Sequence, residues 1–310
     1  MKKIFIDGKA GTTGLRIYER LADRKDIDII LLSEEERKNP IARKNALNSC
    51  DIAFLCLPDD AARESVSMVE NDNVVLIDTS TAHRTLEGWC YGFPELSAEL
   101  DNKLKSAKRI AVPGCHASGF IALVKPLIEA GFISDNELLT CHSITGFSGG
   151  GKKMIADYES DGRNEMLDAP RQYGITQAHK HLKEMQAITG LKNAPIFCPI
   201  VSDFYSGMMV TVPVFASQLK NGKTAEDIKA LFAEKYTSDI VKYQSSIDEG
   251  GFISAAQLKD SDAMTVTVAG NDDRILLIAV YNNLGKGASG AAIECMNVVL
   301  GQEKNLALDI

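Results

Sequence analysis

The sequence lacks any excess of positive charge and any long hydrophobic run. Lysine and arginine number 34 against 42 aspartate and glutamate residues, so the formal charge is −8. Nucleic acids are bound through basic surfaces, so a general nucleic-acid binder is excluded. No segment approaches roughly 18 consecutive apolar residues, and the start, MKKIFIDG, reaches Asp7 and Gly8 before a signal-peptide core can form. We therefore expect a cytoplasmic protein that does not associate with membranes.

Paired cysteines are missing as well. The seven cysteines are an odd number and include no CxxC pair, which indicates reduced thiols rather than a disulfide framework. There is no internal repeat or low-complexity segment, and 45% hydrophobic with 25% charged residues is ordinary for a globular protein. Collagen-like, disordered and coiled-coil proteins are thereby excluded. The 310 residues suffice for two domains, at about 100–200 residues each.

The first third of the chain alternates apolar strands with amphipathic helices. Strands that are apolar on both faces are typical of a parallel sheet covered by helices on each side. We expect strands at 3–7, 27–32, 51–57 and 74–78, and helices at 13–22 and 60–69. The pattern predicts a Rossmann-type, doubly wound α/β domain.

The pattern changes around Cys115. A short strand at 110–112 and a helix at 118–130 precede longer expected strands at 138–144, 195–200, 208–215 and 264–268. Runs of strands without regular intervening helices favour an α+β second domain with a largely antiparallel sheet. A helix at 287–300 is expected to return to the first domain. We therefore predict a first domain of residues 1–115 and 285–310, and a second domain of residues 116–284.

A glycine-rich loop joins the first expected strand to the first expected helix. Its GxxGxxG spacing comprises Gly8, Gly11, Thr12, Thr13 and Gly14. Glycines permit a tight turn and close approach to a pyrophosphate, and the helix start supplies N–H groups and partial positive charge. Because it lies between a strand and a helix, the loop favours a dinucleotide site. The alternative is a glycine turn that merely connects the two elements.

A polar segment after the second strand bears on the choice between NAD and NADP. Glu34 lies near the position where an acid would hold the ribose 2′-hydroxyl of NAD. Ser33 and Arg37, followed by Lys38, instead offer the hydroxyl and guanidinium that suit the 2′-phosphate of NADP. We favour NADP, with a solvated charged turn as the alternative.

Cys115 is the candidate nucleophile among the seven cysteines. It lies in VPGCHASG at the first turn of an expected helix, where the helix dipole and free N–H groups lower the pKa of a thiol. The other six lie in apolar strands, beside one or on a helix face, where a buried structural thiol is the expected role. They are Cys50, Cys56, Cys90, Cys141, Cys198 and Cys295.

A cysteine nucleophile needs a proton partner. The chain has five histidines, and no motif supports His83 or His142 as that partner. His116 is adjacent to Cys115, but neighbouring residues on a helix point apart, so it is a poor partner. His179 and His181 form an unusual HKH pair near the start of a helical run, and one of them is expected to reach the cysteine through the tertiary fold. Without CxxC or HxxxH spacing, no metal site is predicted.

A second glycine-rich segment, TGFSGGGKK at 145–153, is a candidate anion site. Ser148, Gly149 and Lys152 lie in it, and N–H groups of a glycine loop followed by lysines suit a phosphate. The GxxxxGK[ST] pattern is absent, so the segment is not a P-loop. A flexible surface loop is the alternative.

Seven motifs, in order along the whole chain, together resemble the N-acetyl-gamma-glutamyl-phosphate reductase family in its shorter bacterial form. They are DGKAGTTG at 7–14, IDTSTAHR at 77–84, YGFPEL at 91–96, VPGCHASG at 112–119, ITGFSGGGKK at 144–153, HKH at 179–181 and NNLGKGASG at 282–290. The resemblance implies a two-domain enzyme of arginine biosynthesis, akin to aspartate-semialdehyde dehydrogenase, that uses NADP. It implies that residues 1–115 and 285–310 form the NADP-binding domain, and that residues 116–284 form an α+β catalytic and oligomerisation domain. The strand-rich second domain makes a homo-oligomer an expectation.

The resemblance also implies roles for individual residues. Cys115 corresponds to the nucleophile, His181 to the acid/base and His179 to a substrate-site neighbour. Asn283 and Lys286 lie in the stretch that resembles the segment touching the nicotinamide end of the cofactor. From the residues alone, the choice between the two histidines stays open.

The implied reaction is the NADPH-dependent reduction of N-acetyl-L-glutamyl 5-phosphate to its semialdehyde and phosphate through a thioester. Two alternatives remain, namely an aspartate-semialdehyde dehydrogenase-like phosphorylating dehydrogenase and a non-catalytic NADP-binding redox sensor. A small-molecule substrate with a carboxylate needs a cation, and four arginines are unranked candidates: Arg84, Arg109, Arg163 and Arg171.

Overall fold

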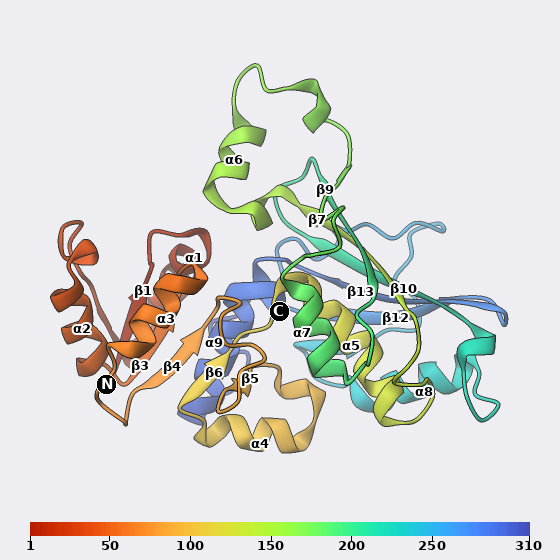
Figure 1. The fold of residues 1–310 in the computed structure, drawn as a ribbon, viewed down its shortest axis with the longest axis horizontal. Helices are drawn as coiled ribbons and strands as arrows, with labels where there is room; N and C mark the ends of the chain where they lie inside the picture. The colour runs from red at the N-terminus through yellow and green to blue at the C-terminus, as the bar shows by residue number, and fades with distance from the viewer. The chain divides into compact units, whose positions relative to one another are not determined.

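The computed structural model describes all 310 residues and divides them into two compact units (Figure 1). The first comprises Met1–Gly114 with Ala288–Leu308, and the second comprises Cys115–Gly287 with Asp309–Ile310. None of the helices has the length and apolar character that a bilayer crossing requires.

The first unit is built on a six-stranded, wholly parallel sheet in the order β2-β1-β3-β4-β6-β5. The strands are β1 (Lys2–Asp7), β2 (Ile27–Ile30), β3 (Ile52–Leu55), β4 (Val75–Asp78), β5 (Cys90–Tyr91) and β6 (Arg109–Ala111). This confirms the predicted doubly wound α/β domain. The strand order reverses beside β1, and open α/β sheets bind ligands at the carboxyl ends of strands at such a switch point.

Helices cover both faces of this sheet because successive strand residues point to opposite sides. Ile4 and Ile6 of β1 pack with helices α1 (Thr12–Leu21) and α9 (Gly290–Leu300), whereas Phe5 packs on the other face with α2 (Pro40–Ser49). In Figure 1, α9 is the blue helix of this unit. The remaining elements are α3 (Asp59–Ser67), α4 (Ala98–Ser106) and the short 3-10 turns Glu36–Lys38 and Pro94–Leu96.

The second unit contains a seven-stranded mixed sheet in the order β11-β12-β13-β10-β7-β9-β8. Only the β7–β9 and β11–β12 pairs are parallel, which confirms the predicted α+β domain with a largely antiparallel sheet. The strands are β7 (Thr140–Gly146), β8 (Arg171–Gln172), β9 (Ile196–Ser202), β10 (Met208–Phe215), β11 (Val241–Tyr243), β12 (Met264–Gly270) and β13 (Arg274–Tyr281).

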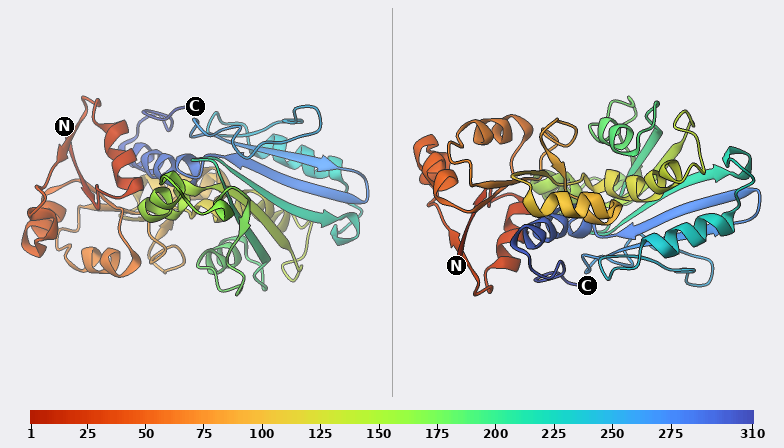
Figure 2. Two further views of the ribbon diagram at one scale, coloured as in Figure 1. Left: turned by 90° about the horizontal axis from the view of Figure 1, so that it is seen from above. Right: turned by 90° about the horizontal axis from the view of Figure 1, so that it is seen from below.

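The long helices of this unit pack on one face of the second sheet. In Figure 2, α8 is the cyan helix beside the strands of this sheet. Helix α5 (Cys115–Glu129) packs on β10 and β13 and against α7 (His181–Thr189), and α8 (Ala225–Lys235) packs on β12. The other elements are α6 (Gly151–Glu159), a π-helical turn at Gly285–Ser289 and the 3-10 turns Phe147–Gly150, Glu165–Leu167 and Ala216–Gln218. The start of α5 and the start of α7 carry the predicted nucleophile and histidine.

Candidate active site

Cys115 is the first residue of α5, which begins three residues before the predicted helix. The helix is apolar and almost entirely buried, but Cys115 itself is only partly buried. The π-helical turn packs so closely on it that a Cβ added at Gly287 would lie 3.0 Å from the Cys115 Cβ. The nucleophile candidate is therefore held at a helix start, where backbone N–H groups favour a thiolate.

Four of the remaining thiols lie in environments that favour the protonated form. Burial raises the pKa of Cys50 and Cys56 to about 12, and it also raises the pKa of Cys90 and Cys141. At neutral pH these groups stay thiols, which are weak nucleophiles.

A cluster of aromatic and histidine rings surrounds His116, the residue after Cys115. The ring centroid of His116 lies 5.8 Å from that of His179 and 5.6 Å from that of His181, and Phe197 is 5.3 Å away. Although His116 follows the nucleophile directly, its side chain is directed into the cluster that contains the HKH pair. The tertiary fold thus joins the start of α5 to the start of α7.

The buried His116 and Ser143 form a hydrogen-bonded chain with the partly buried Tyr173 within this cluster. His116 Nδ1 lies 2.7 Å from Ser143 Oγ, and His116 Nε2 lies 2.6 Å from the Tyr173 hydroxyl. Burial, with a smaller contribution from His179, lowers the pKa of His116 to about 3, so the ring is neutral at physiological pH. Burial and the charge of Cys115 raise the pKa of Tyr173, so its hydroxyl remains protonated.

Ser143 and Tyr173 were not predicted as site residues, and His116 was judged a poor partner for Cys115. Neighbouring helix positions do diverge, so the His116 side chain points away from Cys115. A second element, α7, brings its own histidine to the side chain of His116. No spacing in the sequence signals these contacts, because Ser143 and Tyr173 lie 27 and 57 residues from His116.

Gln177 anchors the loop that carries the HKH pair. Its side-chain amide accepts from the Phe197 N–H at 2.9 Å and donates to the Phe197 carbonyl at 2.7 Å, so the side chain pairs with β9 as a strand would. The backbone N–H of His181 donates to His179 Nδ1 at 3.2 Å. His179 therefore carries its proton on Nε2, and burial lowers its pKa.

The predicted anion loop divides into a buried and an exposed half. Ser148 is buried and its hydroxyl accepts from Asn283 Nδ2 at 3.0 Å, while Asn283 Oδ1 accepts from the Gly207 N–H at 2.9 Å. Gly149 and Lys152 are exposed. Asn283 thus links the loop to the segment before the π-helical turn, in which Lys286 is also buried.

The first unit places the GxxGxxG loop at the carboxyl end of β1. Gly8 has φ of +88°, and a Cβ there would lie 2.3 Å from the Cys56 carbonyl oxygen; one at Gly14 would lie 2.6 Å from the Gly8 oxygen. No side chain caps the start of α1 at Gly11. The first-turn N–H groups, including those of Thr12 and Thr13, thus have no side-chain acceptor, which fits a pyrophosphate.

The predicted 2′-phosphate residues lie in a turn after β2. The Ser33 N–H donates to the Glu36 carboxylate at 2.8 Å, and the Glu36 N–H donates to Ser33 Oγ at 3.3 Å. Arg37 pairs with the exposed Glu34 carboxylate. Exposed pairs are worth at most about 1 kcal/mol, so a phosphate dianion can compete for this guanidinium.

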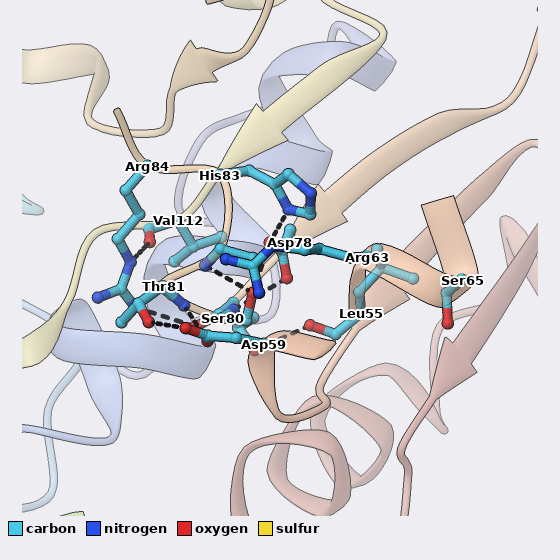
Figure 3. A network of polar contacts seen from close by, with 12 residues as sticks. Leu55, Asp59, Arg63, Ser65, Asp78, Ser80, Thr81, His83, Arg84 and Val112 are labelled. Atoms are coloured by element: carbon cyan, nitrogen blue, oxygen red, sulfur yellow. Dashed lines mark hydrogen bonds and ion pairs between the residues drawn. The ribbon is translucent and has the colours of Figure 1, made fainter. Parts of the chain in front are cut away.

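Arg84, one of the four candidate arginines, binds backbone carbonyls of its own unit. Its Nε donates to the Val112 carbonyl at 2.9 Å and a terminal nitrogen donates to the Thr79 carbonyl at 3.0 Å, so it ties the end of β4 to the segment that leads to Cys115. Figure 3 shows this contact beside the buried Asp78, which lies 2.6 Å from His83 Nδ1.

The other three arginines differ in their availability. Arg109 begins β6, at the end of the sheet opposite to the GxxGxxG loop, and donates to the Val74 carbonyl. Arg163 pairs with both Asp168 and Asp203. Arg171 donates to the Tyr158 hydroxyl at 3.0 Å. It lies two residues before Tyr173 on a segment that pairs with β9, so the two side chains share one side of that segment.

Comparisons with known proteins cover both units. Residues 3–103 match the family model described as semialdehyde dehydrogenase, NAD binding domain, and residues 115–283 match that described as semialdehyde dehydrogenase, dimerisation domain. A protein of Chelativorans sp. named N-acetyl-gamma-glutamyl-phosphate reductase is 44% identical, over 96% of this chain and 98% of its own. One of Nostoc sp. named N-acetyl-gamma-glutamyl-phosphate reductase 2 is 42% identical over 99% of both chains.

Solved structures share the fold at low sequence identity. Aspartate semialdehyde dehydrogenase II of Vibrio cholerae, complexed with ASA, superposes with a TM-score of 0.74 at 17% identity, over 97% of this chain and 98% of that one. Aspartate semialdehyde dehydrogenase of Candida albicans, with NADP, superposes with a TM-score of 0.69 at 16% identity, over 99% of both.

The neutral state of buried His116 predicts a specific acid sensitivity. The folded protein holds this pKa at about 3, against about 6.5 unfolded. Below pH 6.5 His116 binds a proton in the unfolded chain but stays unprotonated in the folded protein. The free energy of unfolding therefore falls as the pH falls. We expect wild type to lose about 2 kcal/mol more unfolding free energy than His116→Gln between pH 7 and pH 5. Denaturant titrations at both pH values measure the difference, and parallel losses in the two proteins would refute a neutral His116.

Proposed function

Because the chain belongs to the N-acetyl-gamma-glutamyl-phosphate reductase family of semialdehyde dehydrogenases, we propose that it reduces N-acetyl-L-glutamyl 5-phosphate with NADPH. The products are N-acetyl-L-glutamate 5-semialdehyde and phosphate, in arginine biosynthesis. The observation that carries the proposal is Cys115 at the first turn of α5, joined through His116 to a cluster with His179 and His181. The seven free cysteines suit a reducing cytoplasm, in which this thiolate persists.

The chemistry proceeds through a covalent intermediate on Cys115. Its thiolate attacks the acyl carbonyl, the carbon–oxygen bond to phosphate breaks, and a thioester forms. Hydride addition to the thioester carbon produces a thiohemiacetal alkoxide, which is protonated. Collapse then breaks the carbon–sulfur bond, releases the semialdehyde and regenerates the thiolate. Two displacements of moderate barrier thereby replace one difficult step.

The cofactor is held by the first unit. Gly8, Gly11, Thr12, Thr13 and Gly14 receive its pyrophosphate, and Ser33 and Arg37 receive the 2′-phosphate that distinguishes NADP from NAD. When bound, NADPH supplies the hydride. Asn283 and Lys286 belong to the segment that we assign to the nicotinamide end.

His181 serves as the acid and base. His179 is held neutral, with its Nδ1 accepting a backbone N–H, which suits a hydrogen-bond donor to substrate through Nε2 rather than a group that cycles its proton. His181, at the start of α7, is left as the group that protonates the alkoxide and then recovers the proton. A positioned acid/base contributes about 10²- to 10⁴-fold.

Phosphate and carboxylate of the substrate take separate cationic sites in this proposal. The exposed Gly149 and Lys152, with the Ser148 turn behind them, receive the departing phosphate. Arg171 receives the substrate carboxylate, because it shares the side of Tyr173 and is bound to a neutral hydroxyl rather than to a carboxylate.

The decisive assay is phosphate-dependent reduction of NADP⁺ with N-acetylglutamate semialdehyde, for wild type and Cys115→Ala. We expect wild type to turn over, to prefer NADP⁺ to NAD⁺, and to use aspartate semialdehyde poorly. Cys115→Ala should lose at least about 10³-fold in kcat, because the covalent path is closed. Cys198→Ala, which removes a partly exposed thiol from β9, is the matched control and should remain active.

Three outcomes would contradict this proposal. An active Cys115→Ala protein would exclude a thioester intermediate on Cys115. Faster turnover of aspartate semialdehyde would assign the chain to the alternative dehydrogenase activity. A wild type that binds NADP⁺ without any turnover would favour the redox sensor.

We also propose that the chain forms a homodimer through the outer face of its second sheet, the face opposite to α5 and α8. Its side chains include Ile196, Phe215 and Leu276, which are 62%, 60% and 38% exposed. In register, Leu276 pairs with Pro213, so apolar side chains continue from strand to strand. A second copy of this face would bury them, and the match of this region to a dimerisation domain supports that partner.

The dimer is tested by placing charges on that face. Ile196→Arg combined with Leu276→Arg should halve the mass measured by light scattering at low micromolar concentration, because buried unpaired charges oppose association. Leu138→Arg, at a residue 73% exposed in the loop before β7, is the control and should keep the wild-type mass. Equal masses for all three proteins would place the interface elsewhere.

A further inference from the structure

A hydroxyl group from another element binds the first turn of α5 at the Cys115 carbonyl and the Gly119 N–H, the two backbone groups that an α-helix pairs with each other. The Gly119 N–H donates to the Tyr281 hydroxyl at 3.0 Å, and that hydroxyl donates to the Cys115 carbonyl at 2.5 Å. Tyr281, the last residue of β13, is fully buried. Its hydroxyl therefore bridges two backbone groups of the turn that carries the nucleophile.

The absence of a side chain at position 119 makes this close approach of Tyr281 possible. A Cβ at Gly119 would lie 2.7 Å from the Tyr281 hydroxyl oxygen and 2.9 Å from its Cε1. Both distances are below any normal contact, so an alanine would push the ring away from the helix. Gly119 therefore admits Tyr281 to the backbone of α5.

A second buried tyrosine serves the same helix for a different reason. Pro126 lies inside α5 and has no N–H, so the Ala122 carbonyl loses its usual partner. The Tyr236 hydroxyl donates to that carbonyl at 2.6 Å. This bond satisfies a buried acceptor that the sequence itself has left without a backbone donor.

The Cys115 carbonyl differs from the Ala122 carbonyl, because residue 119 has an N–H and the helix itself supplies a donor. The Tyr281 hydroxyl is therefore an additional donor to the Cys115 carbonyl, and it restrains the direction of that carbonyl. Its single proton is committed to the Cys115 oxygen and its oxygen accepts from Gly119, so Tyr281 has no proton to give to substrate.

We propose that Tyr281 is a positioning residue for the Cys115 nucleophile, acting through the carbonyl of Cys115 itself. Holding this carbonyl fixes the peptide plane between residues 115 and 116, and with it the direction in which the thiol leaves the backbone. Gly287 closes the opposite side, with its would-be Cβ 3.0 Å from the Cys115 Cβ. Burial and the nearby cysteine charge raise the pKa of Tyr281 well above its usual range, so the hydroxyl stays a donor during turnover.

This inference rests on the proposed role of Cys115, and a pair of matched variants tests it. Tyr281→Phe and Tyr236→Phe each delete one buried hydroxyl that donates to a carbonyl of α5 and leave the ring in place. We expect similar losses in Tm for the two. Only Tyr281→Phe should lower kcat, by at least about tenfold, with KM for the acyl phosphate changed less than about twofold.

A direct readout of the thiol separates positioning from stability. The rate of iodoacetamide reaction at Cys115, followed against pH by mass spectrometry of its peptide, reports how well the first-turn N–H groups favour the thiolate. In Tyr281→Phe the midpoint should rise by at least about 0.5 pH unit, because a relaxed turn moves the sulfur out of that field. The alkylation profile of Tyr236→Phe against pH should coincide with that of wild type.

The outcomes are decisive in either direction. Equal kinetic and alkylation effects in both variants, or none in Tyr281→Phe, would overturn the positioning role. If Tyr281→Phe does not fold, Gly119→Ala displaces the same hydroxyl, and a wild-type alkylation midpoint in that variant would overturn it. Because the alkylation profile is measured without substrate, it stands even if wild type fails to reduce the acyl phosphate, which would instead refute the proposed function.

Discussion

Close packing around the first turn of α5 is the constraint on which the second unit depends. Two elements distant in sequence, β13 and the π-helical turn, approach the Cys115 backbone where Gly119 and Gly287 lack side chains. A nucleophile on a flexible loop would lose conformational entropy each time it is oriented for reaction. At the first turn of α5, packing fixes the orientation of Cys115 before substrate binds. The same turn directs His116 into the ring cluster, so a single backbone geometry positions both the thiol and its polar surroundings.

Those surroundings are polar but kept neutral. Burial holds His116 and His179 toward the uncharged form and holds Tyr173 and Tyr281 as protonated hydroxyls. In a site of low dielectric, neutral dipoles that are already oriented stabilise a developing negative charge without reorganising. A negative charge that develops beside Cys115 is therefore the charge that these neutral, oriented groups can stabilise.

Local patterns predicted the parallel sheet and the place of Cys115 at a helix start, but they could not predict contacts between distant segments. Strands such as Ile52–Leu55 and Val75–Asp78 were predicted because they are apolar at nearly every position, and the structure buries them on both faces. The place of Cys115 was predicted because a helix start is a local feature. Helix α2 was missed because only Ala46 and Leu47 are buried in it, which leaves no amphipathic period, although Asn39 caps it. The links of Cys115 to Tyr281 and of His116 to Tyr173 depend on pairing of segments far apart, which no spacing reveals.

Direct observation of the acyl-enzyme tests the central claim most sharply. Wild type is mixed with N-acetyl-L-glutamyl 5-phosphate in the absence of NADPH, quenched in acid, digested, and analysed by mass spectrometry. The account predicts an N-acetylglutamyl thioester on the Cys115 peptide that disappears when NADPH is added before the quench, as the semialdehyde is released. An acyl group on a different residue, or no acyl-enzyme in a preparation that turns over with NADPH, would contradict it.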